Sequence, residues 1–281
     1  MPVLSIIACR MLEDEIVYLL SADREVRELL LVDGRESLNL SRKLKAQHRP
    51  HLLLALEDIN SHIREMQYKP SRFRSIWGNH SPRAKNLAVV LSPLRLGLHS
   101  NLELLKAAVY DNIRHLSAFS DGILIFYGKC GNSLADIESD LTDISCPLYF
   151  LTDEQGERID DCIAVALGGN ENYDRTLTEY KDVAVFMTPM WASNWNMIGQ
   201  EDTASGKFRD LRSMLKGTAL KRVARINTGL HFENGFGENV ESFAREFGLE
   251  KIELSGGTTV AESSYEKAKN RVLASQDRSK P

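Results

Sequence analysis

Four cysteines are the residues of this chain best suited to chemistry, and three of them stand where a predicted strand ends or the next helix begins. Cys9 closes the apolar run VLSIIAC, Cys130 follows GILIFYG, and Cys162 opens the helical pattern after PLYFLTD. The carboxyl ends of parallel strands meet at one edge of a sheet, where open α/β sheets bind ligands. We therefore expect these three thiols to lie together, with Cys146 at the opposite edge.

Three thiolates in one place would favour a soft metal, so the expected cofactor is zinc or an iron–sulfur cluster. They would leave one coordination position for a substrate, a water or a fourth ligand, for which His99 is a candidate. The chain contains no CxxC or HExxH motif, so this prediction depends on tertiary placement. The alternative is that each cysteine is a small buried hydrophobic residue.

Other residues near the same edge are candidates for catalysis or binding. Cys130 could act as a metal-free nucleophile, and Asp161 as a base or a hydrogen-bond partner of a ligand. Trp191 and Trp195 share a helix face and, with Tyr173, could surround a cationic methylated amine. Acids in a first helical turn also complement the helix dipole, and the tryptophans could equally pack in the core.

Composition and charge exclude several classes of protein. A net charge of −4 argues against nucleic-acid binding through the whole surface. The N-terminal apolar run is too short for a signal peptide or a membrane-spanning helix. We therefore expect a cytoplasmic protein that binds no membrane and whose thiols stay reduced. The Gly-containing stretches match no phosphate-binding loop, and there is no serine nucleophile elbow.

Apolar runs of strand length alternate with helical patterns along the whole chain. This order predicts an α/β fold, with a mostly parallel sheet covered by helices on both faces in Rossmann-like layers. The expected strands are 3–9, 28–33, 87–91, 122–128, 147–153, 183–189, 221–229 and 252–255. The expected helices are 11–22, 51–66, 102–119, one from about Ser133, 160–168, 191–198, 205–215, 238–248 and 263–275.

We expect one domain over residues 1–275 and a disordered tail over 276–281. Residues 64–95 look like an extra, basic and loop-rich segment, which is either a solvated insertion or a surface for an anionic ligand or acidic partner.

Several ordered motifs resemble the domain-of-unknown-function family 1638 of archaea and bacteria. They are IIACRMLEDEI, HSNLELLKAAV, ILIFYGKCGN, the RIDDCIAVALGG region followed by Tyr173, FMTPMWASNW and ARINTGL. Cys9, Cys130 and Cys162 fall on cysteine motifs of that family. In the family the third cysteine usually follows a His-Asp pair, whereas Asp160 and Asp161 precede it here.

The resemblance implies a setting rather than a reaction. Members of the family are often found beside corrinoid-dependent methyltransferases that act on methylamines and betaines. The implied role is a metal-binding accessory protein or enzyme of one-carbon metabolism, with a corrinoid protein or methyltransferase as partner and a small methylated amine as ligand. A metal-free cysteine enzyme and an interaction module that docks a methyltransferase are the alternatives.

Overall fold

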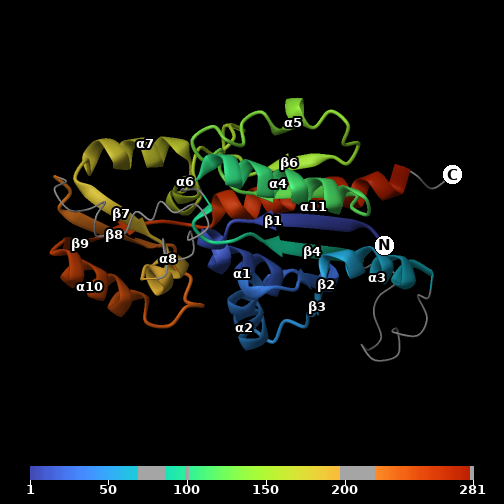
Figure 1. Ribbon diagram of the computed structural model, residues 1–281, viewed down its shortest axis with the longest axis horizontal. Coiled ribbons are helices and arrows are strands. Elements are labelled where there is room, and N and C mark those ends of the chain that lie inside the picture. The colour runs from blue at the N-terminus through green and yellow to red at the C-terminus, as the bar shows by residue number, and fades with distance from the viewer. Residues whose placement is uncertain (69–85, 99–100, 197–218, 279–281) are drawn as a thin grey trace.

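The computed structural model describes residues 1–68, 86–98, 101–196 and 219–278, and within them the strands form two parallel sheets. The larger sheet has six strands in the order β3-β2-β4-β1-β5-β6 and the smaller has three in the order β7-β8-β9 (Figure 1). In the larger sheet the strands are β1 (Val3–Ala8), β2 (Val26–Val32), β3 (Leu52–Leu54), β4 (Leu87–Pro93), β5 (Gly122–Phe126) and β6 (Leu148–Phe150). In the smaller they are β7 (Val183–Met187), β8 (Arg222–Asn227) and β9 (Glu250–Ser255).

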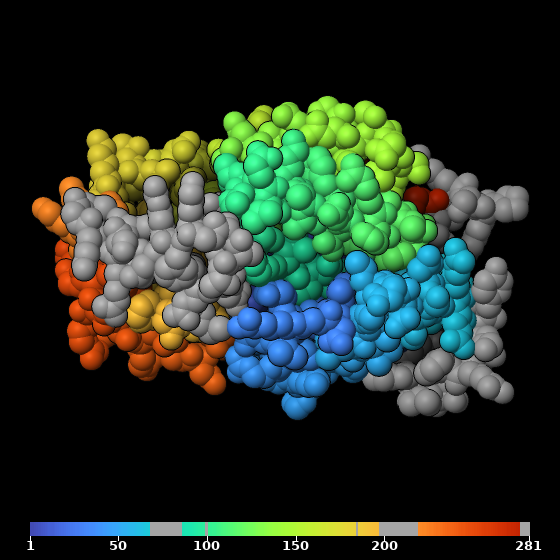
Figure 2. All heavy atoms as spheres, in the orientation of Figure 1, coloured from blue at the N-terminus to red at the C-terminus, as the bar shows by residue number. Residues whose placement is uncertain are grey.

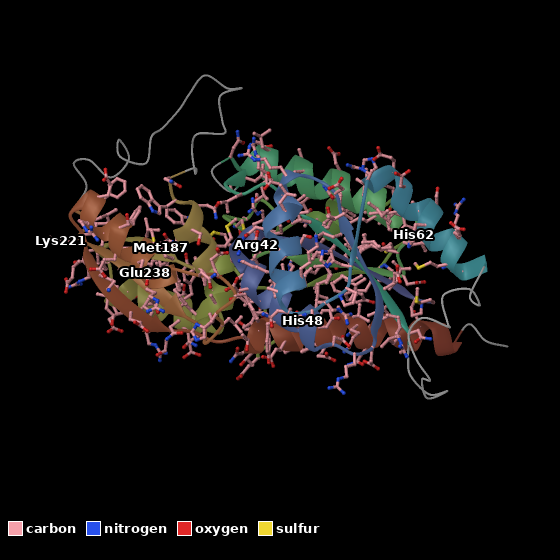
Figure 3. The ribbon with its side chains drawn as sticks, turned by 90° about the horizontal axis from the view of Figure 1, so that it is seen from below. Arg42, His48, His62, Met187, Lys221 and Glu238 are labelled. Atoms are coloured by element: carbon pink, nitrogen blue, oxygen red, sulfur yellow. The ribbon has the colours of Figure 1, made fainter. Side chains whose placement is uncertain are left out.

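The central strands are buried from end to end. Every residue of β1, β4 and β5 is buried, which is the pattern of parallel strands covered on both faces. The covering helices are α1 (Glu13–Ala22), α2 (Leu38–Ala46), α3 (Leu56–Tyr68), α4 (Leu102–Ser117), the short α5 (Ile137–Asp140) and α11 (Thr259–Arg278). Helices α1 and α2 lie on one face and α3 and α4 on the other, as right-handed crossovers require, and α11 packs beside α1 (Figure 3).

The smaller sheet carries its own helices and shares the core of the larger one. Helices α6 (Cys162–Leu167), α7 (Asn170–Glu179), α8 (Pro189–Asn194) and α10 (Phe236–Phe247) surround it, and α11 then returns to the larger sheet. In the space-filling view these yellow to orange residues abut the blue and green part directly (Figure 2). One continuous core joins Ile7 of β1, Ile226 of β8 and Val260 of α11.

The α/β fold with parallel strands is as predicted, but the sequence indicated one sheet and the structure has two. Strand β6 is only three residues long and ends the larger sheet, and two helices separate it from β7. The helix predicted from His51 begins at Leu56, because Leu52–Leu54 pair with β2 as an edge strand. A run of three leucines is compatible with a helix or a strand, and its pairing with β2 makes it a strand.

Other boundaries differ as well. The helix predicted from Ser133 is reduced to Ile137–Asp140, and helices α2 and α7 were not predicted. The ends of the basic segment 64–95 belong to α3 and β4, and its middle, 69–85, lies outside the described residues, as does the helix predicted at 205–215. Helix α11 continues to Arg278, so the predicted tail is helical at 276–278.

Across the described ranges, no helix has both the length and the apolar character needed to cross a membrane.

Candidate functional site

A pocket of about 170 Å³ lies where the carboxyl ends of β1 and β5 meet β7 and α8 of the smaller sheet. Each side of the junction contributes short stretches of chain to its wall. The lining residues are Cys9, Met11, Tyr127, Cys130, Asp161, Cys162, Ile163, Val185, Phe186 and Trp191. The pocket therefore depends on both sheets.

The structure brings Cys9, Cys130 and Cys162 together in this pocket. Cys162 forms side-chain hydrogen bonds with both of the other cysteines. All three thiols are buried, and none of them is in a disulfide. Cys146 is elsewhere, since its thiol donates to the carbonyl of Ser120, 3.3 Å away, beside the amino end of β5. Cys9 and Cys130 follow the carboxyl ends of β1 and β5 and Cys162 begins α6, whereas Cys146 precedes β6, so the fourth thiol lies apart from the other three.

The first two cysteines are joined through the strand ends. The N–H of Cys9 donates to the carbonyl of Phe126 at 3.1 Å, which links the end of β1 to the end of β5. A single 3₁₀ turn, η1 (Arg10–Leu12), follows Cys9, and the N–H of Met11 donates to its sulfur. These bonds fix the Cys9 thiol beside the loop that carries Cys130.

The loop FYGKCGN holds Cys130 against the start of α6. The N–H groups of Lys129 and Cys130 donate to the carbonyls of Ile159 and Asp160, each at 2.8 Å. Gly128 allows this approach, because a Cβ at that position would lie 2.6–2.7 Å from the backbone of Asp161.

Cys130 itself has an uncommon backbone conformation. Its φ is 47°, and the two residues after it, Gly131 and Asn132, also have positive φ. Such conformations are costly for residues with a Cβ and persist only where the surroundings enforce them. The chain thus reverses direction at Cys130 and the two residues after it, and the Cys130 sulfur accepts a hydrogen bond from the N–H of Cys162.

The pocket disfavours thiolates that have no cation beside them. The hydrogen bond to Cys162, followed by burial, raises the pKa of the Cys130 thiol. Burial, followed by the hydrogen bond and charge of Cys162, raises the pKa of Cys9. Burial also raises the pKa of Tyr127, which hydrogen-bonds to Cys9. None of the residues described as lining the pocket is Lys, Arg or His.

A second buried acidic group, the carboxyl group of Glu15, interacts with this cluster of thiols. Glu15 of α1 is 1% exposed, and neither of its carboxylate oxygens has a hydrogen-bond partner of good geometry within the described residues. Its pKa is raised to about 8, chiefly by burial and to a smaller extent by the charges of Asp14 and Cys162, against the lowering effects of its own backbone N–H and of Lys43. Glu15 does not line the pocket, but it is electrostatically coupled to one of the three thiols.

Two of the other predicted residues lie in the pocket wall. Asp161 lines it and caps α6, accepting the N–H of Ile163 at 2.8 Å. Trp191 also lines it, with its outer side packed edge-on against Phe243 at 5.8 Å between ring centroids.

The remaining predicted residues are not in the wall. Trp195 packs between Phe243 and Phe247 of α10, at 5.4 and 5.9 Å. Tyr173 is half-buried on α7, where burial followed by Asp161 raises its pKa to about 12. His99 lies outside the described residues.

The sequence analysis missed most of the apolar wall. Tyr127 directly follows β5, and Val185 and Phe186 are two of the last three residues of β7. The rule that placed the cysteines, applied to every residue near a strand end, would have found these three. Met11 and Ile163 carry no comparable signal, because each follows a cysteine at a helix start and looks like an ordinary core residue.

The thiols do not yet have the spacing of a loaded metal site. Among the described residues, no group of three or more His, Cys, Asp or Glu side chains is arranged to hold a metal ion. Two sulfurs bound to one tetrahedral zinc are ~3.8 Å apart, given bonds of about 2.3 Å.

One protein family matches the chain, and its description is a protein of unknown function, DUF1638. The match covers residues 93–265, more than half of the chain. It includes Cys130 and Cys162 but begins after Cys9, so the resemblance seen around IIACRM extends beyond the matched residues. A search of curated proteins and a search of solved structures each found no match.

Proposed function

The chain belongs to the family of unknown function DUF1638, and we propose that it is a metal-binding protein whose Cys9, Cys130 and Cys162 hold one zinc ion. The observation that carries the proposal is that Cys162 hydrogen-bonds to both other cysteines in one buried pocket. Hydrogen-bonded thiols lie side by side, as the ligands of a single ion must. An iron–sulfur cluster, the alternative cofactor, would place each cysteine on a separate iron.

The donor set and the charge of the pocket both support a soft cation. Thiolates select zinc and iron over magnesium and calcium. Cys9 and Cys130, whose thiol pKa values are raised, lose their protons when a positive charge compensates them, and no basic side chain in the described wall supplies it. A divalent ion would supply that charge and deprotonate its ligands.

The same facts make a metal-free cysteine enzyme the weaker candidate. A nucleophilic cysteine needs a lowered pKa, produced by a nearby base or cation. Here the hydrogen bond to Cys162 and burial raise the pKa of Cys130. The backbone N–H of Cys162 donates to the Cys130 sulfur and lowers its pKa, but the side-chain hydrogen bond to Cys162 and burial outweigh this effect.

The role in methyl metabolism rests on the family and not on the pocket. Zinc bound by three protein ligands keeps a position at which it can act as a Lewis acid. In this proposal the protein is an accessory protein or enzyme that works with a corrinoid protein or methyltransferase. A small methylated amine as ligand finds support in Trp191, Tyr127 and Phe186, whose rings line the pocket and attract cations.

Metal content in cysteine variants tests the proposal. Protein purified without oxygen should contain about one zinc per chain, and Cys130→Ser should lose most of it because serine is a poor ligand for a soft metal. Cys146→Ser is the matched control, since that thiol is also buried but lies at the other edge of the sheet. Equal zinc in the two variants, or none in the wild type, would refute the assignment. A brown protein containing iron and sulfide would replace zinc by a cluster.

A further inference from the structure

The three thiols are covered by walls that come from two different sheets. The pocket has a volume of about 170 Å³, and Cys9, Cys130 and Cys162 are each no more than 6% exposed. The larger sheet supplies one wall, through Cys9 and Tyr127, and the smaller sheet supplies the other, through Phe186 and helix α8. A molecule larger than the pocket therefore reaches the sulfurs only when the two walls move apart.

The chain passes between the two parts of the molecule at two glycine pairs. The smaller part is the smaller sheet with α7, α8 and α10, and the larger part is the larger sheet with its helices and α6, which packs on η1 and α11. Among the described residues, the chain enters the smaller part through Gly168-Gly169 and leaves it through Gly256-Gly257. Gly168 and Gly169 have φ angles of 87° and 128°, which residues with a Cβ rarely adopt.

The two crossings touch each other, so they can act as one hinge. The N–H of Gly257 donates to the carbonyl of Ala166 in α6 at 2.9 Å. Gly256 is so close to the same carbonyl that a Cβ there would lie 2.3 Å from its oxygen. Domain hinges consist of a few residues at the ends of elements that absorb changes in φ and ψ. Two adjacent glycine pairs at element ends meet this description.

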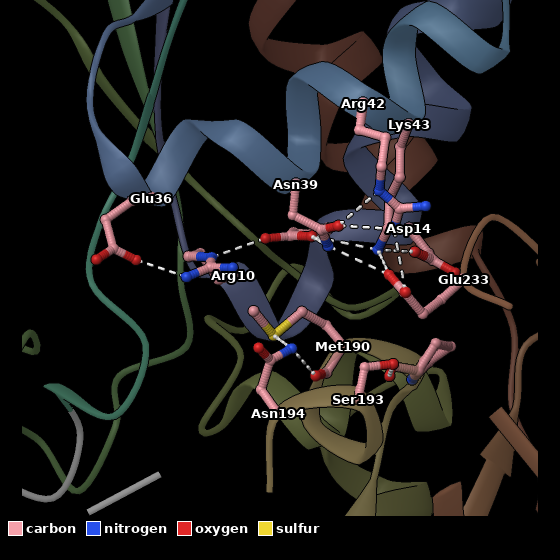
Figure 4. Close-up of polar contacts among 12 residues, drawn as sticks. Arg10, Asp14, Glu36, Asn39, Arg42, Lys43, Met190, Ser193, Asn194 and Glu233 are labelled. Carbon is pink, nitrogen blue, oxygen red and sulfur yellow. Dashed lines mark hydrogen bonds and ion pairs between the residues drawn. The ribbon is translucent and has the colours of Figure 1, made fainter. Parts of the chain in front are cut away.

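Polar contacts on the α2 side of the molecule join the two parts. Glu233, which precedes α10 in the smaller part, contacts Lys43 at 2.8 Å and Arg42 at 3.1 Å, both in α2 of the larger part. It also accepts a hydrogen bond from the side-chain amide of Asn39 in α2, at 3.2 Å (Figure 4). Helices α6 and α2 lie above and below the level of β1 in Figure 1, so these contacts are separate from the hinge.

We infer that the smaller part swings about the two glycine pairs to open the pocket, and that the contacts of Glu233 with α2 hold it closed. Such an opening requires less free energy than global unfolding, because each sheet keeps its own pairing. It exposes Cys9, Cys130 and Cys162 but leaves Cys146 covered, since that thiol lies beside the amino end of β5 within the larger part. The inference holds whether or not the three thiols bind a metal.

Thiol labelling of the full-length, metal-free protein measures the opening. Fluorescein maleimide is much larger than the pocket, so it reaches the three thiols in the open form, and peptide mass spectrometry gives the labelling rate at each cysteine. Glu233→Gln should raise the rates at Cys9, Cys130 and Cys162 at least about tenfold, because breaking a buried ion pair changes an equilibrium by at least that factor. The rate at Cys146 should not change.

Two further variants test the latch and the hinge separately. Glu250→Gln is the matched control for the latch, because Glu250 pairs with Arg222 at 3.1 Å inside the smaller part, and its labelling rates should equal those of the wild type. In Gly257→Ala the new Cβ meets nothing within 4 Å, so the closed form is undisturbed. The lost backbone freedom should slow labelling of the three thiols by about two- to fivefold. This variant tests the hinge even if Glu233→Gln does not fold.

Three results would overturn the inference. The first is an unchanged rate at the three thiols in Glu233→Gln or in Gly257→Ala. The second is an equal acceleration at all four cysteines, which would show global unfolding instead of a hinge. The third is the same acceleration in Glu250→Gln. None of these results bears on the metal content of the protein, so the hinge and the proposed metal site stand or fall independently.

Discussion

At the scale of single residues, Gly128 determines how closely the Cys130 loop approaches Cys162. We expect Gly128→Ala to force the loop from the backbone of Asp161, which a Cβ would meet at 2.6–2.7 Å. Overpacking of this kind typically costs about 1–3 kcal/mol. Metal content should fall together with the unfolding free energy, measured by urea titration.

Gly237→Ala is the control for this prediction. Gly237 lies in α10, its φ is not in the left-handed region, and a Cβ there meets nothing within 4 Å. The substitution should leave metal content unchanged and not reduce stability. Full metal content in Gly128→Ala would mean that the close approach of the loops is not needed for binding.

Glu15 gives a second prediction at this scale. Its pKa is about 8 in the folded protein, mainly because of burial, against about 4.3 in an unfolded chain. The raised value stabilises the folded state fully below the unfolded pKa, and this contribution is lost as pH rises through 8. Each pKa unit corresponds to about 1.4 kcal/mol, so the loss amounts to several kcal/mol.

Urea unfolding of the metal-free wild type and of Glu15→Gln between pH 5 and 9 measures the contribution of Glu15 to stability. The groups that face Glu15, namely Asp14, Lys43 and Cys162, are present in both proteins. The wild type should lose stability across this range, and Glu15→Gln should lose much less. Parallel curves for the two proteins would show that Glu15 is ionised throughout.

At the scale of elements, α11 is tied to the end of α1 by a buried polar group. Asp23 accepts hydrogen bonds from Tyr265 at 2.8 Å and from Lys269 at 2.9 Å. Burial by itself raises the pKa of Asp23, but these bonds outweigh burial, so its net pKa is lower than usual. A lowered pKa stabilises the folded state above the unfolded value of about 3.9 and is lost as pH falls through the folded value.

We therefore expect Asp23→Asn to reduce stability at pH 7 and to flatten the acid limb of the stability curve below about pH 4. Urea unfolding at pH 7 and at pH 2.5–4 measures both effects. The prediction fails if the variant and the wild type lose the same stability between pH 4 and 2.5.

The sequence could predict the elements that position the thiols, because the period and length of the apolar runs define central strands such as β1 and β5. Strand ends then placed Cys9, Cys130 and Cys162 at one edge and Cys146 at the other. Strand β3 could not be predicted, because the secondary structure of its three leucines depends on pairing with β2 at the edge of the sheet. The left-handed backbone of Cys130 depends on contacts with residues 159–161, which local sequence does not contain.

At the scale of the whole molecule, a buried lysine connects helices that cover the larger sheet to the segment before α10, which packs on the smaller sheet. Lys43 of α2 is fully buried and contacts Asp14 at 2.7 Å, Glu13 at 3.2 Å and Glu233, which precedes α10, at 2.8 Å (Figure 4). Arg42 also reaches Glu233, at 3.1 Å, and lies at the boundary between the two parts (Figure 3). These ion pairs join the two parts of the molecule near α1, which carries Glu15, and α8, which carries Trp191.

Lys43→Met should be strongly destabilising, by about 3–5 kcal/mol, because it leaves the buried carboxylates without their cation. Arg42→Met is the matched control, with a side chain that is 55% exposed and contacts the same Glu233. It should cost no more than about 1 kcal/mol. Chemical unfolding at pH 7 compares the two, and similar losses would show that the burial of Lys43 does not govern the energetics.

The central claim is that Cys9, Cys130 and Cys162 bind one metal ion together. X-ray absorption at the zinc edge, on protein loaded with one equivalent of zinc and free of added thiol, tests it most directly. We predict a first shell of three sulfurs at about 2.3 Å and one lighter atom at about 2.0 Å, and Cys146→Ser should give the same spectrum. A first shell of nitrogen and oxygen only, or an unchanged sulfur number in Cys130→Ser, would contradict the account.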